Sequence, residues 1–217
     1  RPPDTAGSLV HRVLCDFFSK VNPEERNPEN LLEMFETGWW ALSPRYLRMD
    51  GVDRLRELSL LQLRNFSQRF DLAAKPFAVE PYFQFEFAPG VLLFGRVDRI
   101  DEERDGSLHI IDYKTGAQED EVDAGQLRLY AIMVEQNLAR PVSKISFWYL
   151  DDGSVWIADL SAEDKHDARS DLLAAIEEME EVSEFPGTIA PHCAYCPYLH
   201  ACALRDAIRQ RREGEGW

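Results

Sequence analysis

The stretches GRVDRID (residues 95–101) and IIDYKTG (residues 110–116) decide the fold of this chain. Each is apolar enough for a largely buried strand, and the turn sequence Arg-Asp-Gly (104–106) separates them. Another β-rich stretch, residues 77–88, precedes a Pro-Gly turn at 89–90. Three strands joined by tight turns predict an antiparallel meander.

Three charged residues stand out on the last two of these strands. Alternate side chains of a strand share a face, so Asp112 and Lys114 should point the same way while Tyr113 points away. Asp98 lies in an otherwise apolar segment, and a buried carboxylate normally needs a cation. The pattern favours metal and phosphate chemistry, and the alternative is a structural salt bridge between neighbouring strands.

Composition indicates a folded globular protein. The chain has 217 residues, of which 45% are hydrophobic, and it contains five Trp and twelve Phe. No apolar run approaches the ~20 residues of a membrane span, so we expect no membrane association. The Arg-Pro-Pro start is typical neither of a signal peptide nor of a natural initiation site, so we expect a trimmed N-terminus.

The net charge of −15 at first argues against a nucleic-acid partner, because phosphate binding normally draws on Lys and Arg. Much of the acid, however, lies in residues 119–123 and 177–184, while basic residues recur between positions 45 and 69. Whether the chain binds nucleic acid therefore depends on where its charges lie. We expect both acidic stretches to be solvated helix faces.

Helices are expected on both sides of the strands. Apolar spacing predicts them at residues 6–18, 31–42, 52–70, about 123–137 and about 161–184, with further strands at 142–150 and 154–158. In the third helix Leu55, Leu58 and Leu61 are expected to form one apolar stripe with Phe66 and Phe70. Ser161 and Asp164 form a candidate capping box.

These elements predict an α/β protein with a mixed central β-sheet flanked by helices. We expect residues 1–217 to form a single domain, with a core of about residues 6–184. A C-terminal cysteine module at about residues 186–204 should clip back onto the N-terminal region.

The order of the motifs resembles the PD-(D/E)XK nuclease superfamily, in its RecB-like exonuclease branch. The resemblance covers most of the chain and implies a restriction-endonuclease-like core. The pieces that match, in family order, are Gly7 with His11, Glu80, Gly95 with Asp98, Asp112 with Lys114, and Gln126 with Tyr130. Each piece alone is common, but five in the correct order form a specific signal.

The resemblance implies a metal site at the centre of these motifs. Asp98 and Asp112 supply hard oxygen ligands for Mg²⁺ or Mn²⁺, and the backbone carbonyl of Tyr113 could add another. His11 would be a nitrogen ligand, and imidazole shifts the preference toward Mn²⁺. Lys114 either orients the attacking water or stabilises charge on the phosphorus, and the sequence does not separate these two roles.

Three further residues complete the predicted site. Gln126 and Tyr130 are four residues apart and so lie on one helical face, where the resemblance implies contact with the active site or with the strand being cut. The alternative is a partly buried polar pair. Glu80 precedes the Asp98 strand and could hold a second metal or a water.

Three of the four cysteines, Cys193, Cys196 and Cys202, are close together in the sequence and indicate metal ligation. In iron-sulfur nucleases of this branch a similar triplet joins an upstream cysteine to hold a [4Fe-4S] cluster. Cys15 follows His11 by only four residues, so either Cys15 is the fourth ligand or that ligand lies in sequence upstream of Arg1. We expect the second, because Cys15 is more simply a core residue. His192 and His200 are substitute ligands, and Zn²⁺ is the alternative metal.

The predicted activity is metal-dependent hydrolysis of DNA phosphodiester bonds by an exodeoxyribonuclease acting in recombination or repair on single-stranded DNA or DNA ends. A helicase is the expected partner, either separate or fused. One alternative is a catalytically silent DNA-binding or scaffold domain of a helicase-nuclease, and another is a structural metal-cluster module. The cysteine usage favours a reducing, cytoplasmic setting.

Overall fold

The computed structural model describes residues 5–116, 118, 122–184 and 186–215. The N-terminal residues 1–4 and part of the acidic stretch 119–123 lie outside the described residues. The chain forms two compact units, Arg1–Asp171 and Leu172–Trp217. No helix among the described residues is long and apolar enough to cross a membrane.

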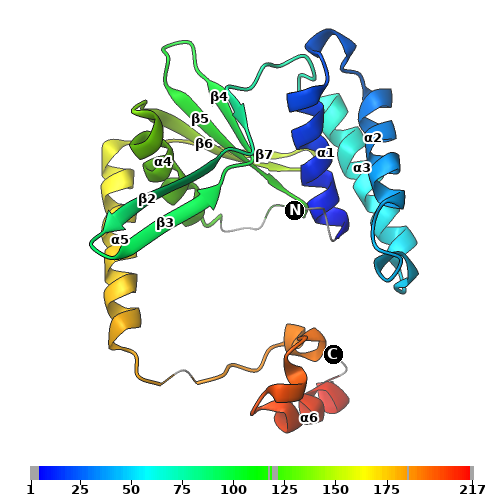
Figure 1. Ribbon diagram of the computed structural model, residues 1–217, viewed down its shortest axis with the longest axis vertical. Helices are drawn as coiled ribbons and strands as arrows, with labels where there is room; N and C mark the ends of the chain where they lie inside the picture. The colour runs from blue at the N-terminus through cyan, green and yellow to red at the C-terminus, as the bar shows by residue number, and fades with distance from the viewer. Residues whose placement is uncertain (1–4, 117, 119–121, 185, 216–217) are drawn as a thin grey trace. The chain divides into compact units, whose positions relative to one another are not determined.

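The first unit is an α/β fold built on a mixed five-stranded sheet of order β1-β4-β5-β6-β7, accompanied by the two-stranded sheet β2-β3 (Figure 1). Only the β5-β6 pair among the described strands is parallel. The elements are α1 (Ala6–Lys20), α2 (Pro28–Trp40), α3 (Val52–Arg69), β1 (Ala78–Val79), β2 (Tyr82–Ala88), β3 (Val91–Arg96), β4 (Arg99–Glu102), β5 (Leu108–Lys114), α4 (Gly125–Leu138), β6 (Val142–Tyr149), β7 (Val155–Asp159) and α5 (Ala162–Glu181), with short 3₁₀ turns at Pro23–Glu25 and Tyr46–Arg48.

Strand β5 separates two hydrophobic cores. Ile111 and Tyr113 face α1–α3 and pack in a cluster with residues such as Phe17 and Phe66. Ile110, on the opposite face, packs under α4 with residues such as Leu127. The sheet is covered on both sides, which explains why β5 is apolar at nearly every position.

The central prediction, a mixed sheet flanked by helices, is confirmed. Helix α4 makes the crossover that a parallel pair such as β5-β6 requires. The capping box is also present, because Asp164 N–H donates to Ser161 Oγ at 3.0 Å and Ser161 N–H donates to Asp164 Oδ2 at 2.9 Å.

The predicted meander differs from the structure in one respect. Residues 77–88 and 91–101 were expected as two continuous strands, but both are interrupted where Glu80 and Pro81 face Val97 and Asp98. The ladder continues through the break, because Glu80 N–H donates to Asp98 O at 2.9 Å and Val97 N–H donates to Pro81 O at 3.2 Å. Glu80 has a positive φ of 46° and proline cannot donate, so the hairpin kinks there.

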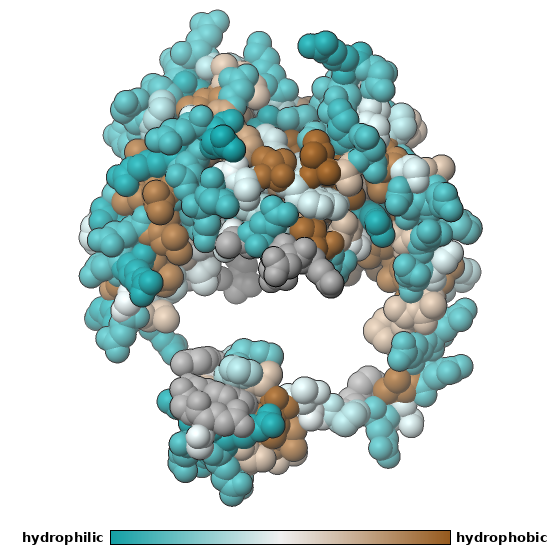
Figure 2. Space-filling model, turned by 180° about the vertical axis from the view of Figure 1, so that it is seen from behind, coloured by the Kyte–Doolittle hydropathy of each residue, from teal (hydrophilic) through white to brown (hydrophobic). Residues whose placement is uncertain are grey.

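The predicted stripe on the third helix was wrong for its three leucines and right for Phe66 and Phe70, which pack in the core. Leu55, Leu58 and Leu61 are 39%, 40% and 46% exposed, whereas Leu63 and Phe66 are fully buried. Helix α3 is therefore rotated relative to the expected apolar face, with its buried side against α1 and α2. Exposed apolar side chains also interrupt the mostly hydrophilic surface seen from behind (Figure 2).

The second unit contains the cysteine triplet. It includes 3₁₀ turns at Pro191–Tyr195 and Leu199–Ala201 and helix α6 (Arg205–Glu215). Cys193, Cys196 and Cys202 are free, partly exposed thiols. The Sγ atom of Cys193 accepts a hydrogen bond from the backbone N–H of Ala190 at 3.5 Å.

The metal site predicted at the cysteines is not preformed among the described residues. No group of three or more His, Cys, Asp or Glu side chains is arranged to hold a metal ion within the described ranges. Cys15 is 9% exposed, and burial, followed by the charges of Glu80 and Asp16, raises the pKa of its thiol. The burial of Cys15 agrees with its interpretation as a small core residue.

Candidate active site

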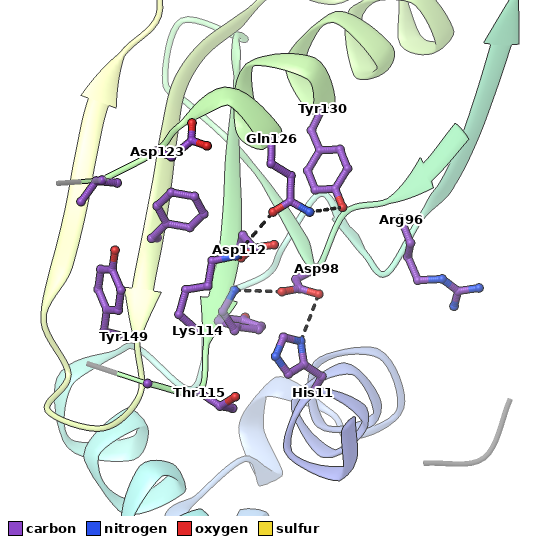
Figure 3. Close-up of a pocket in the computed structure, with 14 residues that line it drawn as sticks. His11, Arg96, Asp98, Asp112, Lys114, Thr115, Asp123, Gln126, Tyr130 and Tyr149 are labelled. Carbon is purple, nitrogen blue, oxygen red and sulfur yellow. Dashed lines mark hydrogen bonds and ion pairs between the residues drawn. The ribbon is translucent and has the colours of Figure 1, made fainter. Parts of the chain in front are cut away.

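A cleft of about 620 Å³ opens where β3, β5 and β6 approach α1 and α4 (Figure 3). It brings together most of the residues singled out in the sequence. Its lining consists of His11, Arg96, Asp98, Asp112, Tyr113, Lys114, Thr115, Gly116, Val122, Asp123, Gln126, Tyr130, Phe147 and Tyr149.

Asp98 is held by contacts from two elements. One carboxylate oxygen, Oδ2, accepts the Tyr113 backbone N–H at 2.8 Å, and the other, Oδ1, lies 3.2 Å from His11 Nδ1. Because Asp98 occupies the kink between β3 and β4, its side chain is free to leave the alternation of the strand and turn toward β5. The kink thus aims the first carboxylate into the cleft.

Asp112 and Lys114 share a face of β5 and form an ion pair. Lys114 Nζ lies 2.7 Å from Asp112 Oδ2 and 4.6 Å from the centre of the Phe147 ring. Burial first, and the neighbouring Asp98 charge second, raise the pKa of Asp112, while Lys114 and His11 oppose the shift. Asp112 therefore depends on nearby cations to stay ionised.

His11 reaches the cleft from α1. Burial lowers its pKa, but the contact with Asp98 and the charges of Asp98, Asp112 and Glu80 together outweigh that effect, so the His11 pKa is raised. Gly7, one turn earlier on α1, faces Thr115, since a Cβ at this position would lie 3.4 Å from Thr115 Oγ1.

A polar chain runs from α4 to the lysine. Tyr130 OH accepts from Gln126 Nε2 at 3.0 Å, and Gln126 Oε1 in turn lies 3.5 Å from Lys114 Nζ. Gly95 allows this arrangement, because a Cβ at that position would lie only 3.0 Å from Tyr130 Cε1. Gln126 and Tyr130 therefore orient the ammonium group from the helix side.

Glu80 lies beside the cleft and does not line it. Its carboxylate accepts a hydrogen bond from Arg96 Nη1 at 3.2 Å, and its side chain is 14% exposed. Its charge still contributes to raising the His11 pKa. The role predicted for Glu80, holding a second metal or a water, stays a prediction.

Several lining residues were missed in the sequence. Phe147 and Tyr149 stand opposite Asp112 and Lys114 in the parallel β5-β6 register. Their alternation within the predicted strand 142–150 was a usable signal, but the register of a parallel pair is not written in either strand alone. Asp123 lines the cleft from the approach to α4, and a lone carboxylate in an acidic stretch carries little signal.

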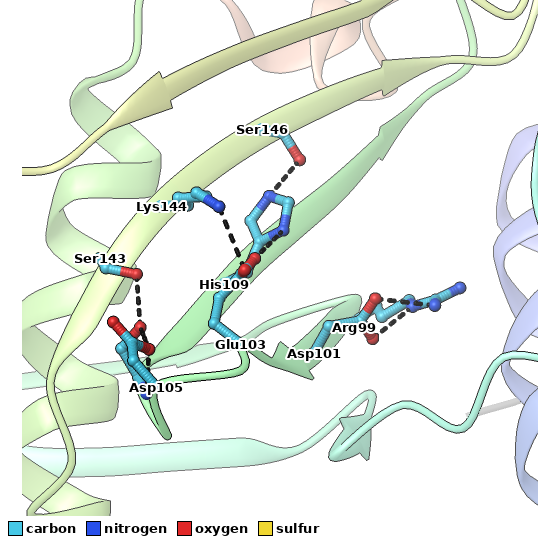
Figure 4. A network of polar contacts seen from close by, with 9 residues as sticks. Arg99, Asp101, Glu103, Asp105, His109, Ser143, Lys144 and Ser146 are labelled. Carbon is cyan, nitrogen blue, oxygen red and sulfur yellow. Dashed lines mark hydrogen bonds and ion pairs between the residues drawn. The ribbon is translucent and has the colours of Figure 1, made fainter.

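A second polar cluster lies outside the cleft (Figure 4). His109 Nε2 is 2.9 Å from Ser146 Oγ and His109 Nδ1 is 3.5 Å from Glu103 Oε1, which places the three groups in the order of a nucleophile, a base and an orienting acid. Ser146 is completely buried, however, so no substrate can reach its hydroxyl. We assign this cluster to the stability of the sheet.

The donor set of the cleft suits a hard divalent cation. Asp112 Oδ2 is buried and accepts no hydrogen bond among the described residues, although it pairs with Lys114. The predicted ligands Asp98, Asp112 and His11 are neighbours, but they do not converge as a preformed metal site in the described part of the chain. Their charges are instead compensated by the Asp98–His11 and Asp112–Lys114 contacts. Two carboxylates and an imidazole match the ligand types that Mg²⁺ and Mn²⁺ take.

A five-stranded mixed sheet with two carboxylates and a lysine at its cleft defines the class of protein. The sequence matches the profile of the PD-(D/E)XK nuclease superfamily over residues 1–203, and the chain belongs to this superfamily.

Two solved structures are similar in fold. One is a proposed exonuclease from Eubacterium rectale, with 12% identity, a TM-score of 0.43, and coverage of 89% of this chain and 80% of that chain. The other is the protein SSO0001, with 16% identity, a TM-score of 0.41, and coverage of 91% and 95%. No curated protein matches significantly.

Proposed function

We propose that the cleft hydrolyses phosphodiester bonds of DNA, on single strands or at ends, with Mg²⁺ or Mn²⁺ as the metal. Membership of a nuclease superfamily implies a nucleic-acid substrate. The observation that supports the proposal most directly is the meeting of Asp98, Asp112 and Lys114 in one cleft, with Lys114 Nζ 2.7 Å from Asp112.

The residues of the chain have distinct tasks in this reaction. Asp98 and Asp112, with His11 beside Asp98, would hold the cation. When bound, such a cation neutralises phosphate charge and promotes ionisation of water. The Lys114 ammonium donates to the phosphate oxygen on which negative charge develops, and Gln126 keeps it in place. The Phe147 ring, whose centre lies 4.6 Å from Lys114 Nζ, adds a cation–π contact to the ammonium group.

The test is cleavage of end-labelled single-stranded and duplex DNA in Mg²⁺, Mn²⁺ or EDTA. We expect product only with metal, and a loss of about 10²–10³-fold in Lys114→Met. Lys144→Met is a matched control, because Lys144 also pairs with a carboxylate, at 3.1 Å, and its side chain is 34% exposed against 37% for Lys114. Lys144 lies outside the cleft, so its variant should keep full activity.

Two outcomes would contradict the proposal. Unchanged cleavage in both Lys114→Met and Asp112→Asn would remove the cleft from the reaction. DNA binding without metal-dependent product in the wild-type protein would favour the silent scaffold instead.

We further propose that the second unit holds a metal through Cys193, Cys196 and Cys202. The spacing of the three cysteines supports this proposal. Iron and zinc analysis of anaerobically purified protein tests it, with visible absorption as a second readout. Iron in the wild type and its loss in Cys196→Ser would support a cluster, zinc without iron would indicate the alternative, and neither metal would refute the proposal.

A further inference from the structure

The hairpin formed by β2 and β3 carries an unusual exposed face, which we call the outer face. In the antiparallel register Tyr82 stands opposite Arg96 and Gln84 stands opposite Phe94. Side chains opposite one another lie on the same face, so these four groups share it with Leu92 and with Glu86, which stands opposite Leu92. Tyr82, Leu92 and Phe94 are 55%, 57% and 62% exposed.

The opposite face of the hairpin is packed against α4, and this packing stabilises the hairpin. Phe83 and Phe87 are buried there, and Gly95 allows close packing against Tyr130 and Met133 of α4. A two-stranded hairpin needs one covered face to be stable, and this one has it. The apolar residues of the outer face are exposed and lie outside both hydrophobic cores, and a group of exposed apolar residues on one surface is typical of a binding site.

The outer face leads to the candidate active site. Arg96 belongs to both, since it also lines the cleft, and Asp98 follows two residues later. In the close-up, Arg96 points away from Asp98, toward the outside of the hairpin (Figure 3). From Leu92 to Arg96 the strand extends about 13 Å, the length of roughly four stacked nucleotides. A linear ligand lying on the outer face would therefore continue into the cleft.

The chemistry of this face fits a single nucleic-acid strand. Two exposed aromatic rings can stack with unpaired bases regardless of sequence. The Arg96 side chain is 54% exposed, and its contact with Glu80 uses Nη1, so Nη2 and Nε can donate to a phosphate. The Gln84 amide, which lies 3.4 Å from Tyr82 OH, adds a neutral hydrogen-bonding group.

We infer that the outer face of the β2-β3 hairpin binds one DNA strand, with bases stacked on Tyr82 and Phe94 and a phosphate on Arg96, and directs it into the cleft. The inference rests on the proposed nuclease function and extends it to the path of the substrate. It explains why large apolar side chains remain exposed beside a site for a highly charged polymer.

The experiment compares Tyr82→Ala/Phe94→Ala with the wild type. Binding of a fluorescent 20-nucleotide single strand is measured by anisotropy in EDTA, which prevents cleavage. We expect affinity to fall at least fivefold for each ring removed, while Tyr82→Phe and Phe94→Trp keep it. Trp40→Ala is the matched control, because Trp40 is 68% exposed on another element, α2, and should not affect binding.

A second measurement separates DNA binding on the outer face from hydrolysis in the cleft. Bis(p-nitrophenyl) phosphate is too small to contact the outer face while it occupies the cleft, so the double variant should hydrolyse it at the wild-type rate and cleave long single strands more slowly. Unchanged DNA affinity in the double variant, with wild-type cleavage intact, would overturn the inference and leave the proposed function standing.

Two further results would also overturn it. Failure of the wild type to cleave either substrate would remove the proposed function itself. If the double variant kept its DNA affinity but shifted a dimer to a monomer in light scattering, the outer face would be an interface with a second copy of the chain.

Discussion

The substitution Gly95→Ala tests how the hairpin and α4 fit together. A Cβ at Gly95 would lie 3.0 Å from Tyr130 Cε1 and 3.2 Å from Met133 Cε. Ordinary carbon contacts are about 3.5–4.0 Å, so the ring must retreat by roughly 0.5–1 Å. Met133 is 1% exposed and has little room, whereas Tyr130 is partly exposed and can move outward. Overpacking of this kind costs about 1–3 kcal/mol.

The matched control is Gly116→Ala, because nothing lies within 4 Å of a Cβ at Gly116. Both substitutions lower the entropy of the unfolded chain similarly, so their difference isolates the contact in the folded state. Urea unfolding should give Gly95→Ala a free energy of unfolding about 1–3 kcal/mol below that of Gly116→Ala. In a Tyr130→Ala background the cost should shrink, because the nearest obstacle is gone.

Free energies of unfolding within about 0.5 kcal/mol of each other in the two glycine variants would refute a close contact at Gly95. An equal cost of Gly95→Ala in the Tyr130→Ala background would refute the role of the Tyr130 ring. A link to activity follows from the hydrogen bond of 3.0 Å between Gln126 and Tyr130. If the ring moves outward, Gln126 loses that partner, and cleavage by Gly95→Ala should fall below that of the wild type.

Three further predictions concern stability, each measured by urea unfolding. Burial lowers the pKa of His109 below 6.5, although nearby carboxylates oppose the shift. Neutral His109 therefore stabilises the folded state above about pH 6.5, and this stabilisation is lost as the pH falls. Between pH 7.5 and 5.5 the wild type should therefore lose up to about 1.4 kcal/mol per pH unit more than His109→Gln, and equal slopes would refute this. Arg99→Met removes the two guanidinium donors that lie 2.7 and 2.8 Å from the Asp101 carboxylate. The free energy of unfolding should fall by about 3–5 kcal/mol. A fall of less than about 1 kcal/mol would show that water replaces the two donors. Leu63→Ala, at a fully buried position, should cost about 2–5 kcal/mol, whereas Leu61→Ala, at a position 46% exposed, should cost under about 0.5 kcal/mol. Equal losses in the two leucine variants would contradict the orientation of α3.

Local patterns predicted the parts of this fold that depend on neighbouring residues. The alternation of Asp112, Tyr113 and Lys114 follows from strand geometry alone, and the structure places Tyr113 in the core under α1 and the other two at the cleft. The capping box of Ser161 and Asp164 is equally local. Such features need only the dihedral preferences of a short segment.

Patterns that depend on a packing partner were less reliable. Leu55, Leu58 and Leu61 have helical spacing, but the spacing does not say which side of α3 meets α1 and α2. The aromatic residues Phe147 and Tyr149 were unnoticed because their place beside Asp112 and Lys114 depends on the register of a parallel pair. Periodicity defines a face, and only the neighbouring elements decide whether that face is covered.

The sequence by itself determined the class of fold and most of the candidate site, because side-chain type and order along the chain carry that information. Tertiary structure alone decided how Asp98 reaches strand β5. The kink at Glu80 and Pro81 turns one carboxylate out of its strand, and the Tyr113 N–H holds it at 2.8 Å. That contact joins residues from separate strands, and its geometry depends on the packing of the whole sheet, which no local pattern encodes.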